Sequence, residues 1–316
     1  MASSFTGGDD GAYPQAGLVL SGRTLYGTAY DGGSSYYGTV FAVNTDSTGF
    51  TNLYSFTGGS DGGNPTTGLV LSDDILYGKI SGVFAVNTNG TGFTNLYSLT
   101  SGNGGGIPGA GLILSGNTLY GTTYFGGGAD DGTVFAINTD GTGFTNIYGF
   151  TGYDYDQTNG DGAFPQAGLI LSGNTLYGTT TFAGGGGNGT VFRVNTDGTD
   201  FTNLHNFATA AYGLLATYTN CDGASPQASL ILLGNTLYGT APEGGNSGYG
   251  TAFAVNTDGT GFTILHSLPA AATELIRRPD WFYAATPCMG RRVIIYRGRM
   301  KKTAKEQYSQ FRSLRN

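Results

Sequence analysis

The sequence predicts an all-β fold made of one four-stranded antiparallel unit that occurs five times. The strongest sign is the segment 111–123, which recurs with small changes at Gly17, Gly68, Gly168 and Ser229. Each copy carries Leu-Tyr-Gly eight residues after its first residue. The composition agrees, because 58 glycines without a Gly-X-Y period, together with 13% aromatic residues, are typical of short strands joined by turns.

The first repeat shows how the four strands are expected to follow one another. We expect strands at 16–20, 24–28, 39–43 and 50–56, because apolar residues alternate or run continuously there and turn residues separate them. A Gly-Arg or Gly-Asn pair joins the first two strands, and Asn-Thr-Asp-Gly-Thr-Gly or a variant joins the last two. Since strands such as 134–137 are apolar on both sides, both faces of each sheet should be covered, as in the blades of a β-propeller.

Loop lengths distinguish a constant side of the fold from a variable one. From the proline of each repeat to the leucine of Leu-Tyr-Gly the spacing is 11 residues in all five copies. The connection between the second and third strands is shortened in the second copy, and the connection from the fourth strand to the next repeat lengthens along the chain. In an up-and-down sheet these two connections lie on one side, which we call the upper face; the opposite side is the lower face. Variable loops on a constant scaffold predict recognition at the upper face.

The two ends of the repeat region predict a closed ring of five blades. Residues 4–8 match the end of a fourth strand such as 55–59, and the last repeat ends in a fourth strand at 262–268. We therefore expect the C-terminal strand to join the N-terminal blade, which would leave no open sheet edge. The propeller domain would cover 1–268. A basic, non-repeat tail would follow at 269–316, disordered or partly helical.

Charge restricts the possible partners. Only three of the 14 basic residues but 18 of the 21 acids precede residue 273, so the repeat region is strongly acidic. An acidic surface repels phosphate, so we expect no nucleic-acid partner for the repeat region and favour a neutral or cationic ligand. The sequence contains no apolar run long enough to predict a membrane span, and the start of the chain does not resemble a signal peptide. We expect the protein to be a monomer. Cys221 and Cys288 could form a disulfide, but their spacing does not predict a zinc site.

Three motifs together resemble the bacterial Gloeo/Verruco (GloVer) tandem repeat. They are Tyr-Ser-Phe-Thr-Gly-Gly at 54–59, Gly-Ala-Tyr-Pro-Gln-Ala-Gly-Leu at 11–18, and Leu-Tyr-Gly-Thr-Thr at 119–123 with the glycines and Gly-Thr-Val-Phe that follow it. The resemblance covers residues 4–268. It implies a propeller-like protein that is extracellular or attached to the bacterial cell surface, with no defined biochemical activity. The tail does not resemble an anchor segment of that family.

Sequence motifs give little support for catalysis. The segment 58–62 has the spelling Gly-x-Ser-x-Gly, but it lacks the strand-to-helix turn and the histidine partner that a nucleophilic serine needs. His205 and His266 stand where other fourth strands have tyrosine, so we expect structural roles for them. A glycosidase on such a propeller needs two carboxylates that face each other across its central channel, and the predicted first strands carry no acid. Carboxylates from the loops could still reach this channel. We therefore predict no catalytic residue and keep a glycoside hydrolase as the least favoured alternative.

The residues that we expect to bind a ligand combine amides, aromatic rings and carboxylates at the upper face. Amides can hydrogen-bond a sugar and rings can stack on it, while carboxylates would suit a basic peptide. The same residues could instead form turns and close the blades. Asp9 with Asp10, Asp130 with Asp131, and Asn159 with Asp161 carry oxygen ligands that suit calcium, but they lack the spacing of known calcium loops, so we predict no cofactor. The predicted ligand-binding residues are Gln15, Gln166, Gln227, Tyr13, Phe164, Asp10, Asp161 and Asp222.

The favoured function is therefore a non-enzymatic extracellular binding module that recognises a glycan or another surface ligand through the upper face. The alternative from a different class is a structural or adhesive repeat protein without a small-molecule site.

Overall fold

The computed structural model describes residues 4–99, 106–107, 109–152, 160–209, 211–212 and 218–269 of the 316-residue chain. These residues form strands and no helix, so none of them belongs to a helix that could span a membrane. Five sheets each contain four consecutive strands, paired antiparallel in chain order. We call them blades 1 to 5. The predicted tail beyond residue 269, with Cys288 and the helical segment expected there, lies outside the described residues.

The strand bounds repeat from blade to blade. Blade 1 comprises β1 (Val19–Ser21), β2 (Thr24–Ala29), β3 (Thr39–Asn44) and β4 (Thr51–Ser55). Blade 2 comprises β5 (Val70–Ser72), β6 (Ile75–Lys79), β7 (Gly82–Asn87) and β8 (Thr94–Ser98). Blade 3 comprises β9 (Ile113–Ser115), β10 (Thr118–Thr123), β11 (Thr133–Asn138) and β12 (Thr145–Gly149). Blade 4 comprises β13 (Ile170–Ser172), β14 (Thr175–Thr180), β15 (Thr190–Asn195) and β16 (Thr202–Asn206). Blade 5 comprises β19 (Ile231–Leu233), β20 (Thr236–Ala241), β21 (Thr251–Asn256) and β22 (Thr263–Ser267). Between blades 4 and 5 along the chain, β17 (Ala211–Tyr212) pairs with β18 (Tyr218–Thr219) in a separate two-stranded sheet that the sequence did not predict.

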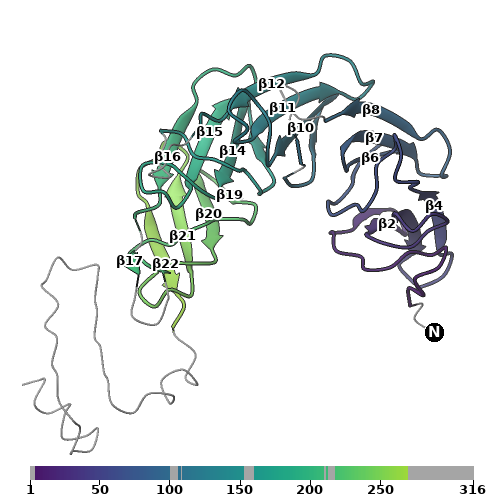
Figure 1. Ribbon diagram of the computed structural model, residues 1–316, viewed down its shortest axis with the longest axis horizontal. Helices are drawn as coiled ribbons and strands as arrows, with labels where there is room; N and C mark the ends of the chain where they lie inside the picture. Colours follow the sequence, from purple (N-terminus) through teal and green to yellow (C-terminus); the bar gives the residue numbers. More distant parts are fainter. Residues whose placement is uncertain are drawn as a thin grey trace, which may run out of the picture.

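The blades follow one another along an arc, with first strands on the inner side and fourth strands on the outer side (Figure 1). The inner sides lie close together. A Cβ on Gly68 would be 3.4 Å from the carbonyl oxygen of Gly17, and one on Gly111 would be 3.5 Å from that of Gly68. Between blades 4 and 5 the N–H of Gly168 donates to Ser229 Oγ over 3.0 Å. Successive repeats thus converge just before their first strands, as propeller blades converge toward an axis.

The first strands are shorter than the sequence predicted. In blade 1 the first strand covers Val19–Ser21 instead of 16–20, whereas the other three predicted strands agree with the structure to within one residue. The physical reason is the convergence of the repeats, because the segment before each first strand contacts an adjacent repeat instead of joining the ladder of its own sheet. Thr28 Oγ1 of β2, for example, donates to the carbonyl oxygen of Thr67 over 3.3 Å.

Packing explains why Leu-Tyr-Gly ends in glycine. In blade 3 a Cβ on Gly121 would lie 2.7 Å from the ring of Phe135 and 3.0 Å from Leu112 Cδ2. Both side chains are buried, and equivalent phenylalanine and leucine side chains crowd the corresponding glycine in the other four blades. Any larger residue would push the third strand's phenylalanine out of the core.

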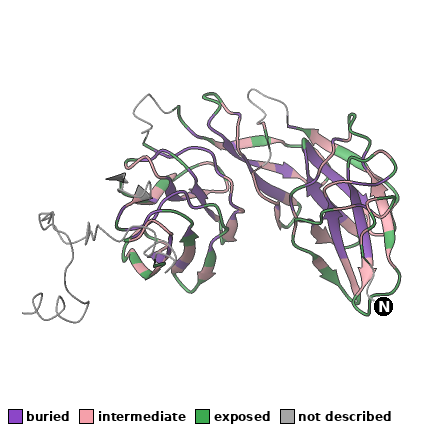
Figure 2. Cartoon of the chain, turned by 60° about the horizontal axis from the view of Figure 1, so that its bottom comes forward, coloured by how far each residue is buried: buried purple, intermediate pink, exposed green. Residues whose placement is uncertain are grey.

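A hydrophobic core fills each space between consecutive blades. Val40 and Phe56, from blade 1 and the loop that leaves it, pack with Leu76 and Phe84 of blade 2. Equivalent clusters lie between blades 2 and 3, 3 and 4, and 4 and 5. The middle of the sheets is therefore buried, while the turns at their ends are exposed (Figure 2). Each sheet is covered by its neighbours rather than by a second layer of its own.

The predicted exchange of the C-terminal strand does not occur in the described part of the chain. β22 pairs with β21 of its own blade, and β4 completes the first sheet. The two end blades lie at opposite ends of the arc (Figure 1). The physical reason is local, because in every repeat a short turn returns the chain from the third strand directly to the fourth, so that each sheet is complete before the next begins.

A carboxylate holds the loop that leads from one blade to the next. Asp61 accepts hydrogen bonds from the N–H of Thr57 over 2.9 Å, from Thr57 Oγ1 over 2.5 Å and from the hydroxyl of Tyr54 over 2.9 Å. Burial raises the pKa of Asp61, but these hydrogen bonds outweigh it and leave the pKa below its ordinary value. Burial and the bond to Asp61 raise the pKa of Tyr54 to about 12. The equivalent acids are Asp10, Asp161 and Asp222.

Lys79 is an exception in the junction between blades 2 and 3. It occupies the position that Thr28 has in blade 1, and its side chain is 1% exposed. Its Nζ donates to the carbonyl oxygen of Thr122 and lies 5.5 Å from the centre of the Phe135 ring. Burial lowers the pKa of the Lys79 ammonium to about 7.

Asp61→Asn should lower the free energy of unfolding by about 1 kcal/mol, because the Thr57 and Tyr54 donors lose a charged acceptor. Asp9→Asn is the matched control, since Asp9 is exposed and its carboxylate makes no hydrogen bond to any residue that the structure describes. Urea unfolding of both variants at neutral pH measures the difference. Equal stabilities would contradict the role of Asp61 as a loop clamp.

Lys79→Met should stabilise the protein at neutral pH, and this advantage should shrink as the pH rises toward about 10. Unfolded chains keep the lysine protonated up to about 10.5, whereas the folded protein loses the proton near 7. Between these values the unfolded state binds more protons, so the wild type gains stability with pH by up to about 1.4 kcal/mol per pH unit.

Urea unfolding of wild type and the Lys79→Met variant across this pH range provides the measurement. The carbonyl oxygen of Thr122 keeps the N–H of Gly109 as a donor, at 3.2 Å, when the lysine is replaced. A stability difference that stays constant with pH would show that Lys79 does not titrate in the folded state as its burial requires.

Candidate ligand-binding site

The three glutamines predicted to bind a ligand stand at the first position after the proline of their repeats. Gln166 and Gln227 belong to the adjacent blades 4 and 5, whereas Gln15 belongs to blade 1 at the other end of the arc. Their amides make no hydrogen bonds to other described residues. In the third repeat Gly109 takes this position. A Cβ on Gly109 would collide with the carbonyl oxygen of Pro165, so there is no room for a side chain there. Two of the three predicted amides thus stand at equivalent positions of adjacent blades.

The acids predicted as ligand-binding residues are engaged in the loops that they stabilise. Asp161 accepts hydrogen bonds from Tyr148, over 2.7 Å, and from Thr151. Asp222 lies 2.9 Å from His205 Nε2. Asp10 accepts hydrogen bonds from the N–H and the hydroxyl of Thr6, as Asp61 does from Thr57. These carboxylates therefore shape the upper face and offer it few unoccupied lone pairs.

Of the acids considered for calcium, Asp10, Asp130 and Asp161 are held in the same way, whereas Asp9 is exposed. Asp130 Oδ1, for instance, accepts the N–H of Gly126 over 2.8 Å. Asn159 lies outside the described residues. Among the residues that the structure does describe, no three histidine, cysteine or acidic side chains are grouped so that they could hold a metal ion.

The residue before the proline has the same unusual backbone in four repeats. Tyr13, Asn64, Phe164 and Ser225 have φ values of 52°, 57°, 58° and 57°. Residues other than glycine seldom adopt this left-handed conformation, and residues before proline usually avoid it. Two of the predicted ligand-binding residues therefore share one backbone geometry. Tyr13 is 68% exposed, whereas Phe164 is almost fully buried.

Phe164 belongs to an aromatic cluster on the upper face between blades 3 and 4. Its ring stacks on Tyr124 with centroids 4.9 Å apart, and Phe125 meets both of these rings edge-on at 5.5 and 4.6 Å. Phe182 lies 6.0 Å from Phe164 and is 40% exposed. Ile107, which is exposed, adjoins the cluster because its carbonyl oxygen accepts the N–H of Tyr124. We call Tyr124, Phe125, Phe164 and Phe182 the aromatic platform.

The platform was only partly expected from the sequence. The sequence indicated aromatic residues in the upper loops, but it could not show that the rings of three separate loops meet. The β10–β11 loop supplies Tyr124 and Phe125, the loop before β13 supplies Phe164, and the β14–β15 loop supplies Phe182. A short antiparallel bridge between Ala163 and Phe182 holds two of these loops together.

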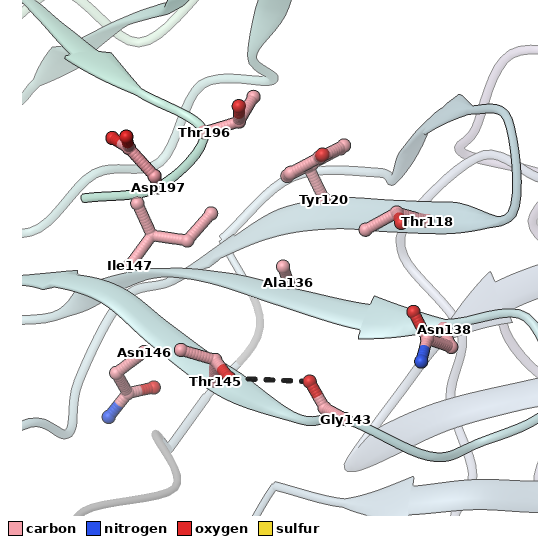
Figure 3. Close-up of a pocket in the computed structure, with 10 residues that line it drawn as sticks. All are labelled: Thr118, Tyr120, Ala136, Asn138, Gly143, Thr145, Asn146, Ile147, Thr196 and Asp197. Atoms are coloured by element: carbon pink, nitrogen blue, oxygen red, sulfur yellow. Dashed lines mark hydrogen bonds between the residues drawn. The ribbon is translucent and has the colours of Figure 1, made fainter. Parts of the chain in front are cut away.

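A groove of about 300 Å³ lies on the lower face, also between blades 3 and 4 (Figure 3). Thr118 and Tyr120 of β10 line one side of it, and Thr196 and Asp197, from the turn after β15, line the other. The carboxylate of Asp197 accepts hydrogen bonds from Thr199 within its own turn. Sequence reasoning missed this groove, since the same Asn-Thr-Asp-Gly turn occurs in other repeats and gives no signal specific to one junction.

Solved structures with a similar fold share little sequence with this chain. The extracellular domain of a putative hybrid two-component system from B. thetaiotaomicron matches with a TM-score of 0.50 and 13% identity, over 79% of this chain and 27% of that chain. A nidogen/laminin complex gives 0.47 and 14% over 78% and 76%, and a GH74 enzyme from Niastella koreensis gives 0.49 and 17% over 79% and 38%. The chain thus spans only a small part of the two-component-system domain, and the likeness concerns the fold. A search of curated proteins finds no match.

Family membership rests on the sequence of the repeats themselves. The model of the Gloeobacter/Verrucomicrobia repeat matches residues 79–286, which is more than half of the chain and includes blades 3, 4 and 5. The matched region contains the Leu-Tyr-Gly segments and loops that build the aromatic platform. The chain therefore belongs to the Gloeobacter/Verrucomicrobia repeat family.

Proposed function

We propose that this protein is a non-enzymatic binding module that holds a neutral glycan on its upper face, with the aromatic platform as the main contact. The observation that carries the proposal is the meeting of four rings from three loops, with Phe182 left 40% exposed at the edge. An extracellular or cell-surface location is part of the proposal and is what the family resemblance implies.

The chemistry of the platform fits a sugar better than a charged ligand. The CH face of a pyranose can stack on an exposed ring such as Phe182, while its hydroxyl groups need hydrogen-bond partners beside the ring. Gln166 follows Phe164 by two residues, and its amide makes no hydrogen bond to other described residues, so it can donate and accept. Asp161 is already bonded to Tyr148 and Thr151. The platform therefore offers apolar surface and amide groups rather than a free charge at this position.

The position of the platform also suits recognition. It lies among the loops whose lengths vary most between repeats, on blades whose strands are nearly identical. Rigid strands position such loops, and the loops carry the differences that specificity requires. Because Gln227 is on the blade adjacent to that of Gln166, an extended glycan could reach both amides, while Gln15 at the other end of the arc would remain uninvolved.

Phe182→Ala should weaken binding of any glycan identified on an array of neutral and charged glycans by about five- to tenfold, because a stacking surface is lost. Gln166→Ala should weaken it as well. Isothermal titration calorimetry with the best glycan measures both. Tyr36→Ala is the matched control, since Tyr36 is an exposed aromatic residue of the blade 1 loops, outside the platform.

Two results would overturn the proposal. One is an array on which no glycan binds the folded protein. The other is a glycan whose affinity falls in the Tyr36 variant and is unchanged in the Phe182 variant, which would move the site to blade 1.

A further inference from the structure

The two end blades each expose one face that is buried in every other blade. At each internal junction the outgoing face of one blade, which looks toward the next repeat, packs on the incoming face of its successor. Blade 1 has no blade before its incoming face, and blade 5 has none after its outgoing face, among the residues that the structure describes. The structure therefore contains the two halves of one junction, separated by the length of the arc (Figure 1).

The incoming face of blade 1 is apolar and open. Leu18 is 52% exposed, whereas its equivalent Leu112 in blade 3 is 5% exposed. Leu20 is exposed as well, and Leu25 is partly exposed although its equivalent in each of the other blades is fully buried. No change of residue type accounts for this, because all five repeats have leucine at the positions of Leu18 and Leu20. The difference is the missing neighbour.

The N-terminal segment already supplies one residue of that missing neighbour. Phe5 meets the rings of Phe41 and Phe50 with centroids 5.1 and 5.8 Å apart and interplanar angles of 70° and 87°. Phe56, which leaves blade 1, meets the equivalent rings of blade 2 at 5.4 and 6.0 Å, with angles of 71° and 79°. Phe5 thus occupies the position of the phenylalanine that follows a preceding fourth strand. The fourth strand itself is what the incoming face lacks.

The outgoing face of blade 5 presents such a strand. Leu265 of β22 is 55% exposed, whereas its equivalent Leu204 in blade 4 is 6% exposed because blade 5 covers it. The next residue, His266, is exposed. Its equivalent His205 stacks on Phe262 with centroids 3.4 Å apart, as Tyr54 stacks on Phe93 at the first junction. Blade 5 therefore ends in the side chains that every internal junction uses.

We propose that the outgoing face of blade 5 binds the incoming face of blade 1 in a second copy of this chain, head to tail. The four internal junctions show the geometry of such a contact, with Leu265 covering the leucines of the first strand and His266 stacking on Phe50. Phe5 of the second copy takes the place that the residue after the fourth strand has at internal junctions, so Leu268, the residue of blade 5 at that position, would stay outside the contact. The chain's own blade 1 lies at the far end of the arc and is not the occupant (Figure 1).

A head-to-tail contact uses two different surfaces, so each copy keeps one free face after pairing. Such contacts extend into rings or open filaments according to the rotation between copies. The repeat region is acidic, so salt that screens repulsion between copies should favour association. These properties separate the proposal from a symmetric dimer and from closure of a single chain.

Leu20→Asp and Leu265→Asp each place a charge on one end face and should each give a monomer of 32.6 kDa. Wild type should associate further as its concentration rises. A mixture of the two variants should form a complex of one copy of each, because the intact outgoing face of the first meets the intact incoming face of the second. Light scattering coupled to size exclusion, at physiological salt, measures all four samples.

Leu233→Asp is the matched control. Leu233 is as exposed as these residues and lies on β19, but the other four repeats have serine there, outside the junction, so the variant should associate like wild type. Circular dichroism confirms that each variant is folded. A wild type that stays monomeric at every concentration would overturn the proposal, as would either end-face variant that still dimerises alone, or a mixture that contains only monomers.

Discussion

Every sheet in this chain is apolar on both faces, so each blade depends on a neighbour to cover each face. A buried leucine or phenylalanine contributes about 1.5–3 kcal/mol, and each junction buries several of them. The blades therefore resemble the units of a repeat array, in which stability comes from each unit together with the contact to the next. This need for a neighbour explains three recurring features. They are the crowded glycine of Leu-Tyr-Gly, the third-strand phenylalanine that packs against it, and the aromatic pair that stacks across each junction.

Much of the fold could be predicted from the sequence, because the repeats are almost identical and their turns are distinct. The second, third and fourth strands lie where the pattern placed them. The first strand was placed too early, since residues 16–18 are apolar like a strand but lie before the ladder, where Gly17 approaches Gly68 of the next repeat. Ring closure could not be predicted reliably. Because the repeats are nearly identical, the incoming face of any blade is compatible with the outgoing face of any other, so the repeat pattern does not say which blade, if any, covers the two end faces.

A binding surface was harder to predict than the fold, because the same residue types form loops and bind ligands. Asp161 and Asp222 were expected at a binding surface, yet their carboxylates bond to their own loops. The recurrence of aspartate four residues after Thr6 and Thr57 was a signal for such a clamp. No sequence pattern predicted the aromatic platform. Its rings come from three loops, and only the packing of blade 3 against blade 4 brings these loops together.

The left-handed residue before the proline of four repeats has a consequence for how such a protein can diverge. Tyr13, Asn64, Phe164 and Ser225 are chemically unlike one another, yet their φ values differ by only a few degrees. The path of the main chain there is therefore set by its surroundings and not by the side chain that it carries. Evolution can exchange an aromatic ring, an amide or a hydroxyl at this point without rebuilding the loop, so one scaffold can carry a different chemical group on each of these four blades.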